Sequence, residues 1–201
     1  GQVLRVIERA KDFMIGTFLQ RGKRLKFIPD DEKLQDKLLT VKYDQNFLPV
    51  EGMKVLCRIQ KYGAAIVLYV ERVIGYKDDP GVDILAILLD HDIDPQFPEA
   101  VMEEVKTIPQ EIQESEKKER VDLTNETTVT IDGDDSKDFD DAVSVTPVEN
   151  GWVLKVSIAD VSHYVTENSA LDKEALARGC STYVTDRVVP MLPHELSNGI
   201  C

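Results

Sequence analysis

The residues best suited to chemistry are aspartates gathered in one short stretch of the chain. Six of the ten residues from 132 to 141 are aspartate, and the same stretch holds a single lysine, Lys137. Carboxylates this close repel one another, which is tolerable in open solvent or around a divalent cation. Mg²⁺ prefers hard oxygen ligands, usually one or two carboxylates together with waters and phosphate oxygens. Paired divalent ions activate an attacking water and stabilise the leaving oxygen of a phosphodiester. The acidic cluster therefore predicts a divalent-metal site.

Three other interpretations of the acidic cluster compete with this one. A solvated acidic loop is the usual fate of an aspartate run, although here apolar strands flank the run and Phe139 lies inside it. An EF-hand calcium loop starting at Asp132 needs glycine at its sixth position and glutamate at its twelfth, where this chain has Lys137 and Val143. A set of helix caps needs a helix directly afterwards, and residues 142–145 are rich in β-branched valine. Spacing alone favours a metal site and leaves the solvated loop open.

The elements that precede this cluster begin as short strands separated by turn residues. Apolar or alternating runs recur along the first 70 residues, bounded by glycine, proline and aspartate. Such spacing is typical of a small all-β barrel of the oligonucleotide-binding type, which we expect over residues 12–76. Residues 1–11 are expected to contain the last strand of a preceding barrel. The strands predicted for the barrel are residues 13–19, 25–29, 38–43, 54–59 and 64–70.

Helical and then mixed patterns follow the strands. Residues 77–123 are acidic and carry two apolar helical stripes, one after Asp79-Pro80-Gly81 and one starting at Pro98, which predicts a helical connector. Its polar end, residues 110–120, is expected to be an exposed helix or linker. From residue 124 the pattern becomes α+β, so the predicted fold is multi-domain: an oligonucleotide-binding barrel, a helical connector and the incomplete start of an α+β domain. Strands are expected in this last part at 127–131, 143–145 and 152–159, and a helix at 170–178 that ends at Gly179.

Charge distribution and cysteine content indicate which binding partners and which cellular location to expect. Net charge is −13, yet residues 1–75 hold 14 basic and 9 acidic residues, whereas 76–123 and 124–201 each hold 5 basic and 14 acidic ones. A basic front suits a polyanion and an acidic back suits divalent cations, although charge also varies by chance between segments. The sequence contains no apolar run of about 18 residues, which is the length that would predict a membrane span. The 3 scattered cysteines favour a reducing, cytoplasmic location. A chain without an initial Met or a secretory signal suggests an internal fragment.

Three sequence blocks resemble one enzyme family. Residues 130–143, which contain the acidic cluster, are similar to the signature of the catalytic domain of the ribonuclease II/ribonuclease R (RNB) exoribonucleases. Residues 158–165, and residues 186–193 with Leu196-Ser197-Asn198 after them, match further blocks of that family in the same order. Ahead of them, Gly16-Thr17-Phe18 and Phe27-Ile28-Pro29-Asp30-Asp31 resemble the second cold-shock-like domain of the ribonuclease R type. Residues 12–76 are thus expected to be a cold-shock-like barrel and residues 124–201 the N-terminal part of an RNB domain.

This resemblance implies a chemistry for the acidic cluster. The family hydrolyses RNA processively from the 3′ end and releases 5′-mononucleotides with the help of Mg²⁺, for which Mn²⁺ is a substitute. Asp140 is the residue whose loss is expected to harm the chemistry most, whereas Asp134 and Asp135 lie between motif positions and are interpreted as structural. Tyr183 matches a family tyrosine that stacks on a base near the 3′ end, with an ordinary strand aromatic as the alternative. The metal ligands carried over are Asp132, Asp138, Asp140 and Asp141.

The barrel is expected to guide single-stranded RNA, with basic side chains on phosphates and aromatic ones under bases. The candidates surround the first predicted hairpin, and the competing interpretation is that the basic residues are merely solvated and the aromatic one belongs to the core. These candidates are Arg21, Lys23, Arg24, Lys26 and Phe27.

The resemblance also implies that part of the active site lies elsewhere. The family's catalytic domain continues beyond residue 201 with a further carboxylate and a phosphate-clamping arginine, so the isolated chain is expected to be inactive. The expected partner is single-stranded RNA, with no membrane, no obligate protein partner, and a monomeric parent protein. His163 is expected to be a structural histidine, because metal-assisted hydrolysis needs no general base. The alternative function is a nucleic-acid-binding module without catalysis, in which the aspartates only hold structure.

Overall fold

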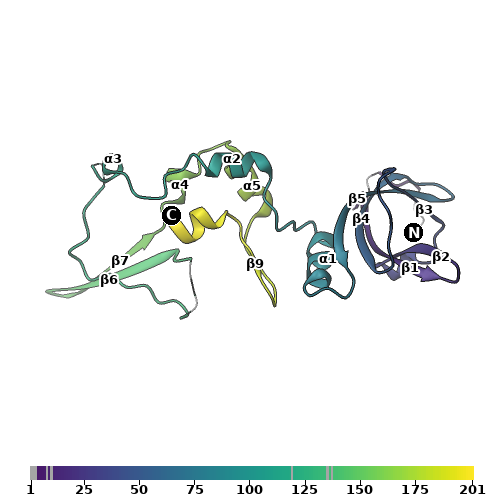
Figure 1. The fold of residues 1–201 in the computed structure, drawn as a ribbon. Helices are drawn as coiled ribbons and strands as arrows, with labels where there is room; N and C mark the ends of the chain where they lie inside the picture. The colour runs from purple at the N-terminus through teal and green to yellow at the C-terminus, as the bar shows by residue number, and fades with distance from the viewer. Residues whose placement is uncertain (1–3, 8, 10, 119, 135, 137) are drawn as a thin grey trace. The chain divides into compact units, whose positions relative to one another are not determined.

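The chain folds into two compact units, residues 1–93 and residues 94–201. The computed structural model, drawn in Figure 1, describes residues 4–7, 9, 11–118, 120–134, 136 and 138–201. Each unit has its own hydrophobic core, and each is described by itself below. The boundary falls inside the stretch expected to be a helical connector, so that stretch divides between the two units.

The first unit is built on a five-stranded sheet with the order β2-β1-β4-β5-β3. All neighbouring strands are antiparallel except β3 and β5, which are parallel. Every strand predicted for the barrel is present, and β5 extends further than the alternation indicated. The short helix η1 lies between β2 and β3. The bounds are β1 Phe13–Arg21, β2 Arg24–Pro29, η1 Glu32–Leu34, β3 Leu39–Lys42, β4 Met53–Lys61 and β5 Ile66–Tyr76.

The predicted barrel does not close in this structure. Among the described residues β2 and β3 stand at the two ends of the sheet and are not paired with each other, so the ladder has two free edges. Partial opening is a known property of five-stranded oligonucleotide-binding folds. The sheet curves around a core in which the rings of Phe18 and Phe27 pack edge to face with their centroids 5.8 Å apart. Val55, Cys57 and Leu68 are completely buried in the same core.

Helix α1, Val82–Asp90, covers the opposite face of the sheet (Figure 1). Its Ala86 and Leu89 pack with Phe13 and Ile15 of β1 in a second apolar cluster. This helix was expected after Asp79-Pro80-Gly81 and is confirmed. A strand was expected within residues 1–11. Residues 4–7 have no regular structure, so no strand is present there, and residues 1–3, 8 and 10 lie outside the described residues.

Gly16 marks the place where β1 passes closest to β2. A Cβ atom at Gly16 would lie 2.4 Å from the backbone oxygen of Ile28 and 2.5 Å from the ring of Phe27. We expect Gly16→Ala to destabilise the first unit by about 2 kcal/mol, because the paired backbone of Ile28 cannot move away without breaking the ladder. Urea unfolding of the chain measures this change.

Gly63→Ala is the matched control, because the nearest atom to its new methyl group is 3.6 Å away. That variant should unfold within about 0.5 kcal/mol of the wild type. Equal stability of the Gly16 variant and this control would contradict the close approach of β1 to β2.

The second unit combines short helices with two hairpins. The hairpin predicted around Glu149-Asn150-Gly151 is confirmed, as is the helix at 170–178 ended by Gly179. Helix α2 begins after Pro98, which occupies the cap position and not the first turn. The bounds are α2 Glu99–Val105, α3 Glu114–Lys117, β6 Asp141–Val148, β7 Gly151–Ile158, α4 Val161–Tyr164, α5 Ala170–Arg178, β8 Thr182–Tyr183, β9 Val188–Val189 and η2 Leu196–Ile200.

Helices α2 and α5 and the C-terminal helix η2 enclose the core of the second unit. Val101 and Val105 of α2 pack with Leu171 of α5 and with Leu192 and Leu196. The pattern that predicted α2 from its apolar stripe is therefore confirmed, with two of its members buried.

The prediction of a strand over residues 127–131 is wrong, because no ladder forms there. Only Val129 pairs, in a single bridge to Val143 with reciprocal backbone hydrogen bonds of 2.9 Å. Ile131 is 86% exposed and Val129 49% exposed, so burial does not support a longer ladder there. Among the described residues no helix is long and apolar enough to cross a membrane.

Candidate functional site

A pocket of about 130 Å³ in the second unit is lined by part of the acidic cluster. Asp138 and Asp140 are among the residues that line it, and Tyr183 is another. Val161 and Leu192 belong to the apolar lining, which continues into the core of the unit. Two predicted metal ligands and the predicted base-stacking residue therefore line one cavity, although 43 positions separate Asp140 from Tyr183 in the printed sequence.

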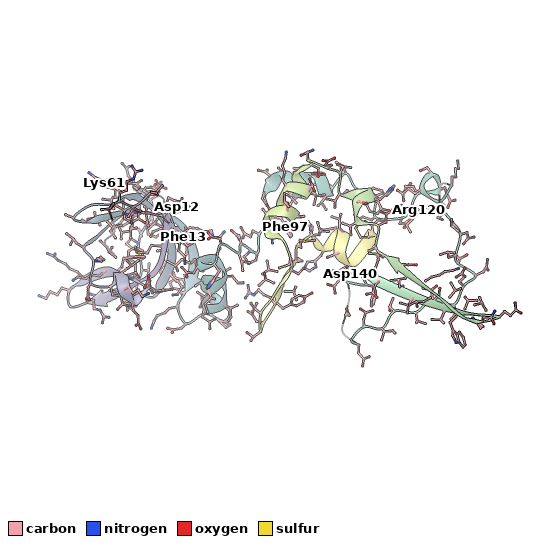
Figure 2. All side chains as sticks on the ribbon, turned by 180° about the vertical axis from the view of Figure 1, so that it is seen from behind. Asp12, Phe13, Lys61, Phe97, Arg120 and Asp140 are labelled. Carbon is pink, nitrogen blue, oxygen red and sulfur yellow. The ribbon has the colours of Figure 1, made fainter. Side chains whose placement is uncertain are left out.

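The β6–β7 hairpin fixes the backbone of Asp140. Strand β6 begins at the next residue, Asp141, which is paired in register with Ile158 of β7. The amide of Ala159 then donates a 2.8 Å hydrogen bond to the carbonyl oxygen of Asp140, one step beyond the last paired residues. Figure 2 shows Asp140 beside the C-terminal helix η2, whose Ser197 lines the same pocket. Alternating β-branched residues in β6 and β7 explain why a hairpin forms directly after the aspartate run.

The predicted metal ligands are only partly gathered. Asp132, Asp140 and Asp141 are exposed and Asp138 is half-buried, and none of the four forms an ion pair with a described residue. Asp138 accepts a long 3.5 Å hydrogen bond from Ser136. Among the residues that the structure describes, which leave out Asp135 and Lys137, no three His, Cys, Asp or Glu side chains form a group able to hold a metal ion. The quartet stays a prediction, with two members in the pocket.

The donor chemistry of the pocket nevertheless fits a hard divalent cation. Mg²⁺ is commonly held by one or two carboxylates, with substrate phosphate oxygens and waters completing its shell. Asp138 and Asp140 supply that number of carboxylates, and no described cation neutralises either of them. We therefore assign Asp138 and Asp140 as the residues of this chain that suit such an ion.

Tyr183 is presented by a short hairpin of strands β8 and β9. Its side chain is 69% exposed, which leaves a ring face open for stacking. Thr182 and Tyr183 pair with Val189 and Val188, and the amide of Val184 donates a 3.1 Å hydrogen bond to the carbonyl oxygen of Arg187. An exposed ring is able to stack on a base, while the role of Tyr183 toward RNA stays a prediction.

The basic residues of the first hairpin lie on the surface of the first unit. Arg21 and Arg24 are directly opposite each other in the β1–β2 ladder, a like-charge pair that is unfavourable unless solvent or an anion screens it. Lys23 lies in the turn between them, and Lys26 is exposed on β2. Their contact with RNA stays a prediction.

Phe27 belongs to the core and not to the surface. Its side chain is 8% exposed and packs against Phe18, so the interpretation as a core aromatic describes this structure. The aromatic residue that the sequence reasoning missed is Tyr43, which is 43% exposed. Tyr43, Lys37, Arg21 and Lys26 line a cavity of about 690 Å³ at the free edges of β2 and β3. Lys37 was missed because its segment has no aromatic or turn signal that distinguishes it from other exposed lysines.

A second cluster of charged side chains lies close to Asp140. Arg120 donates to Asp160 over 2.5 Å, and the side chain of Glu116 accepts a 3.2 Å hydrogen bond from the Tyr164 hydroxyl. His163 Nε2 lies 3.5 Å from the other oxygen of Glu116. His163 is therefore held by a structural partner, as expected. Sequence reasoning missed Arg120 and Glu116, because their partners are 40 and 48 positions away along the chain.

These contacts shift the pKa values of both carboxyl groups downward. The hydrogen bond from Arg120 holds the pKa of Asp160 below its ordinary value. Desolvation acts to raise the pKa of Glu116, but hydrogen bonds from Gln113, Tyr164 and His163 outweigh it and lower that pKa. Both carboxylates are thus more stable in the charged form when the unit is folded.

We expect the second unit to lose stability in acid mainly through Glu116, whose side chain is much less exposed than that of Asp160. A carboxyl group with a lowered folded pKa stabilises the fold above its unfolded pKa, near pH 4, and that contribution disappears as pH falls through the folded value. Glu116→Gln should lower the free energy of unfolding at pH 7 and should lose less stability than the wild type between pH 5 and pH 3. Urea unfolding at several pH values measures both changes.

Glu111→Gln is the control, because it removes the same charge from an exposed position of the same segment. Its pH dependence should follow that of the wild type. A Glu116→Gln variant with the wild-type slope in acid would show that the contacts with Tyr164 and His163 do not form in solution.

Comparison with known proteins identifies both parts of the chain. Residues 120–201 match the family described as RNB domain, and residues 27–98 match the family described as cold shock domain. The chain is 43% identical to Ribonuclease R 1 of Lactococcus lactis subsp. lactis (strain IL1403) over 220 residues, covering 100% of this chain and 26% of that protein. It is also 43% identical to Ribonuclease R of Thermotoga maritima over 213 residues, covering 100% of this chain and 29% of that protein.

A solved structure shows the same fold. Mycoplasma genitalium RNase R in complex with double-stranded RNA superimposes with a TM-score of 0.84 at 33% sequence identity, covering 98% of this chain and 35% of that one. The chain therefore belongs to the RNB family and carries a cold shock domain ahead of its RNB segment. Within that family, ribonuclease R is the protein to which it is similar along its whole length. The chain spans 26% and 29% of the two curated relatives, so the activity of the whole protein is taken up as a proposal.

Proposed function

We propose that the protein carrying this chain is a 3′-to-5′ exoribonuclease that hydrolyses RNA processively to 5′-mononucleotides with Mg²⁺. The observation that carries the proposal is the pocket shared by Asp138, Asp140 and Tyr183. The proposal is supported because two aspartates and an exposed tyrosine line one pocket within the segment that matches the RNB family. Mn²⁺, which accepts the same oxygen ligands, is expected to substitute for Mg²⁺.

The carboxylates of this chain bind and orient. Asp138 and Asp140 would hold the divalent ion against the 3′-terminal phosphodiester, where such an ion lowers the pKa of a bound water and stabilises the leaving oxygen. Asp132 and Asp141 are proposed to complete the ligand set. Asp140 is proposed as the residue most important for the reaction, because the Ala159 amide and the start of β6 fix its backbone on both sides.

The aromatic and basic residues grip RNA without reading its sequence. Tyr183 would stack on a base near the 3′ end, since every base offers a π-face to an aromatic ring. Arg21, Lys23, Arg24 and Lys26 would contact phosphates of a single strand approaching the first unit. Such contacts suit an enzyme that must advance over any base.

The 201 residues by themselves are proposed to be inactive. A phosphate-clamping arginine and a further carboxylate are expected beyond this segment, and two carboxylates in one pocket do not complete a two-ion site. The parent protein is proposed to act as a monomer on single-stranded RNA, without an obligate protein partner.

The decisive experiment follows mononucleotide release from 3′-labelled single-stranded RNA by the full-length protein. We expect release that requires Mg²⁺ or Mn²⁺, stops with a chelator and proceeds from the 3′ end. RNA whose 3′ end is blocked by attachment to a bead serves as the control for direction. Internal cleavage, or release that continues without divalent ions, would overturn the proposal.

The second candidate function is a single-stranded nucleic-acid-binding module without catalysis. It is favoured by one observation, namely that no three metal-binding side chains gather among the described residues. This module would bind RNA with the same affinity in chelator and in Mg²⁺ and would release no nucleotides. The assay above separates the two functions directly.

A further inference from the structure

We propose that residues 113–120, the clamp segment, are a working part of the candidate active site, in which Arg120 and Glu116 act as positioning residues for Asp140. This inference rests on the proposed function, because it concerns the same pocket. The clamp segment contains α3 and the residues on either side of it, and it holds residues 159–164, the α4 turn. That turn directly follows the end of β7 and contains helix α4.

The first contact of the clamp is the ion pair between Arg120 and Asp160. Arg120 Nη2 lies 2.5 Å from Asp160 Oδ2. Asp160 occupies the N-cap position of α4, where an aspartate commonly accepts a hydrogen bond from a nearby backbone amide. Here its side chain makes no cap hydrogen bond. Its carboxylate instead accepts from Arg120, and a weaker 3.4 Å hydrogen bond comes from Ser162. The aspartate therefore serves a long-range contact in place of a local one.

The second contact is made by Glu116 at the other end of the α4 turn. One oxygen of Glu116 accepts from the Tyr164 hydroxyl, and the other lies 3.5 Å from His163 Nε2. Glu116 is itself fixed by a capping box, because its side chain accepts from the amide of Gln113. Its side chain is 13% exposed, so these partners surround it closely. The clamp segment thus contacts the α4 turn near both of its ends, at Asp160 and at His163 and Tyr164.

The α4 turn is directly bonded to Asp140. Ala159, the residue before Asp160, donates its amide to the carbonyl oxygen of Asp140 over 2.8 Å. Ala159 and Val161, on the two sides of Asp160, both line the pocket that contains the Asp138 and Asp140 carboxylates. A displacement of Asp160 would therefore shift both the pocket wall and the backbone that carries Asp140. Figure 2 labels Arg120 and Asp140, both in the second unit.

Positioning is a better explanation of this clamp than stability alone. Arg120 and Asp160 are 45% and 47% exposed, and ion pairs this exposed contribute little to folding. Small displacements of a reacting group, in contrast, are costly, since about 1 Å of misplacement lowers a rate by ~100-fold. The expected signature is a large fall in kcat with little change in melting temperature.

The test uses Arg120→Ala, Asp160→Asn and the double variant in the full-length protein. Each single variant should lower kcat ~10-fold or more while KM stays within about 2-fold, because RNA binding by Tyr183 and the basic hairpin is untouched. The double variant should be no slower than the slower single variant, since both remove the same contact. Hydrogen exchange at the Ala159 amide, followed without metal or RNA, should rise ~10-fold in each variant.

Lys117→Ala is the matched control. It removes an equally short ion pair, Lys117 to Glu114 at 2.7 Å, from helix α3 of the same segment, without touching the α4 turn. It should match the wild type in kcat and in Ala159 exchange. If Arg120→Ala does not fold, Arg120→Lys replaces it, and we expect an intermediate kcat because charge is kept but the planar fork is lost.

Two outcomes would overturn the clamp. One is wild-type kcat and wild-type Ala159 exchange in Arg120→Ala, and the other is an equal loss of both in Lys117→Ala. The exchange measurement keeps this inference separate from the proposed function. If the wild-type protein released no nucleotides, the exonuclease proposal would fail, while Ala159 exchange would still decide whether the clamp holds the backbone of Asp140.

Discussion

Asp140→Asn in the full-length protein is expected to lower kcat for mononucleotide release by ~1,000-fold or more. Asparagine has the shape of aspartate but no charge, so it binds a hard divalent cation much more weakly. The backbone hydrogen bond from Ala159 does not depend on the side chain, so the fold around the pocket should be preserved. RNA affinity measured in chelator should change by less than about 3-fold, because stacking and phosphate contacts come from other residues.

Two other substitutions make the result specific to Asp140. Asp134→Asn changes an exposed aspartate of the same cluster that does not line the pocket, and it should reduce kcat by less than about 3-fold. Tyr183→Ala should act mainly on binding and raise KM ~10-fold, the value of one lost stacking contact. An Asp140→Asn enzyme with more than about a tenth of the wild-type kcat would remove Asp140 from the chemistry.

Much of the fold was predictable because local patterns and tertiary packing agree in it. The five strands of the first unit follow runs of alternating or β-branched residues. Strands β4 and β5 bury alternate residues, whereas residues 13–18 of β1 are buried on both faces because α1 covers the second face. Helix α5 was predicted with its exact end because Gly179 adopts a φ of 74°, which glycine tolerates at a helix terminus. The β6–β7 hairpin followed from β-branched residues on both sides of Glu149-Asn150-Gly151.

The misses come from features that a local pattern does not contain. Residues 127–131 have strong β-propensity, yet none of them is buried, and they pair with β6 only at Val129. Phe27 was grouped with the basic residues beside it, but its alternation with Arg24 and Lys26 puts it on the opposite face of β2, where its ring packs against Phe18 of another strand in the core. Closure of a barrel likewise depends on whether β2 reaches β3, which neither strand encodes by itself.

The candidate site was predictable in its chemistry but not in its supports. Six aspartates in ten residues favoured a cation site over a solvated loop, and Asp138 and Asp140 do line one pocket. Arg120 gave no such signal, because one arginine in a polar stretch resembles any solvated residue. Its significance depends on Asp160, which only the fold brings to it.

Arg178 is another support of this kind, at the end of helix α5. Its side chain is 11% exposed and donates to Glu174 over 2.8 Å, to the carbonyl oxygen of Pro190 over 3.2 Å and to that of Gln96 over 3.0 Å. Its guanidinium carbon also lies 3.8 Å from the ring centroid of Phe97. One side chain thus joins α5 to the segment before α2 and to the end of the β8–β9 hairpin that carries Tyr183.

We expect Arg178→Ala to destabilise the second unit by about 3 kcal/mol, since it leaves two carbonyl groups and a partly buried carboxylate without their donor. Arg178→Lys should cost about half as much, because lysine can still pair with Glu174 but cannot reach both carbonyl oxygens with a planar fork. Lys173→Ala, on an exposed position of the same helix, should remain within about 0.5 kcal/mol of the wild type. Urea unfolding of the 201-residue chain measures these differences.

Hydrogen exchange would show which residues lose stability in the Arg178→Ala variant. In Arg178→Ala, amides of residues 181–191 should exchange faster, because the hairpin loses its anchor at Pro190 while Ser181 still accepts from the amide of Met191. Within the part of the chain that the structure describes, Arg178 makes no hydrogen bond or ion pair with the β6–β7 hairpin, which should exchange as in the wild type. Faster exchange in both hairpins would mean that Arg178 supports the whole unit, whereas unchanged exchange at 181–191 would show that Tyr183 is positioned without it.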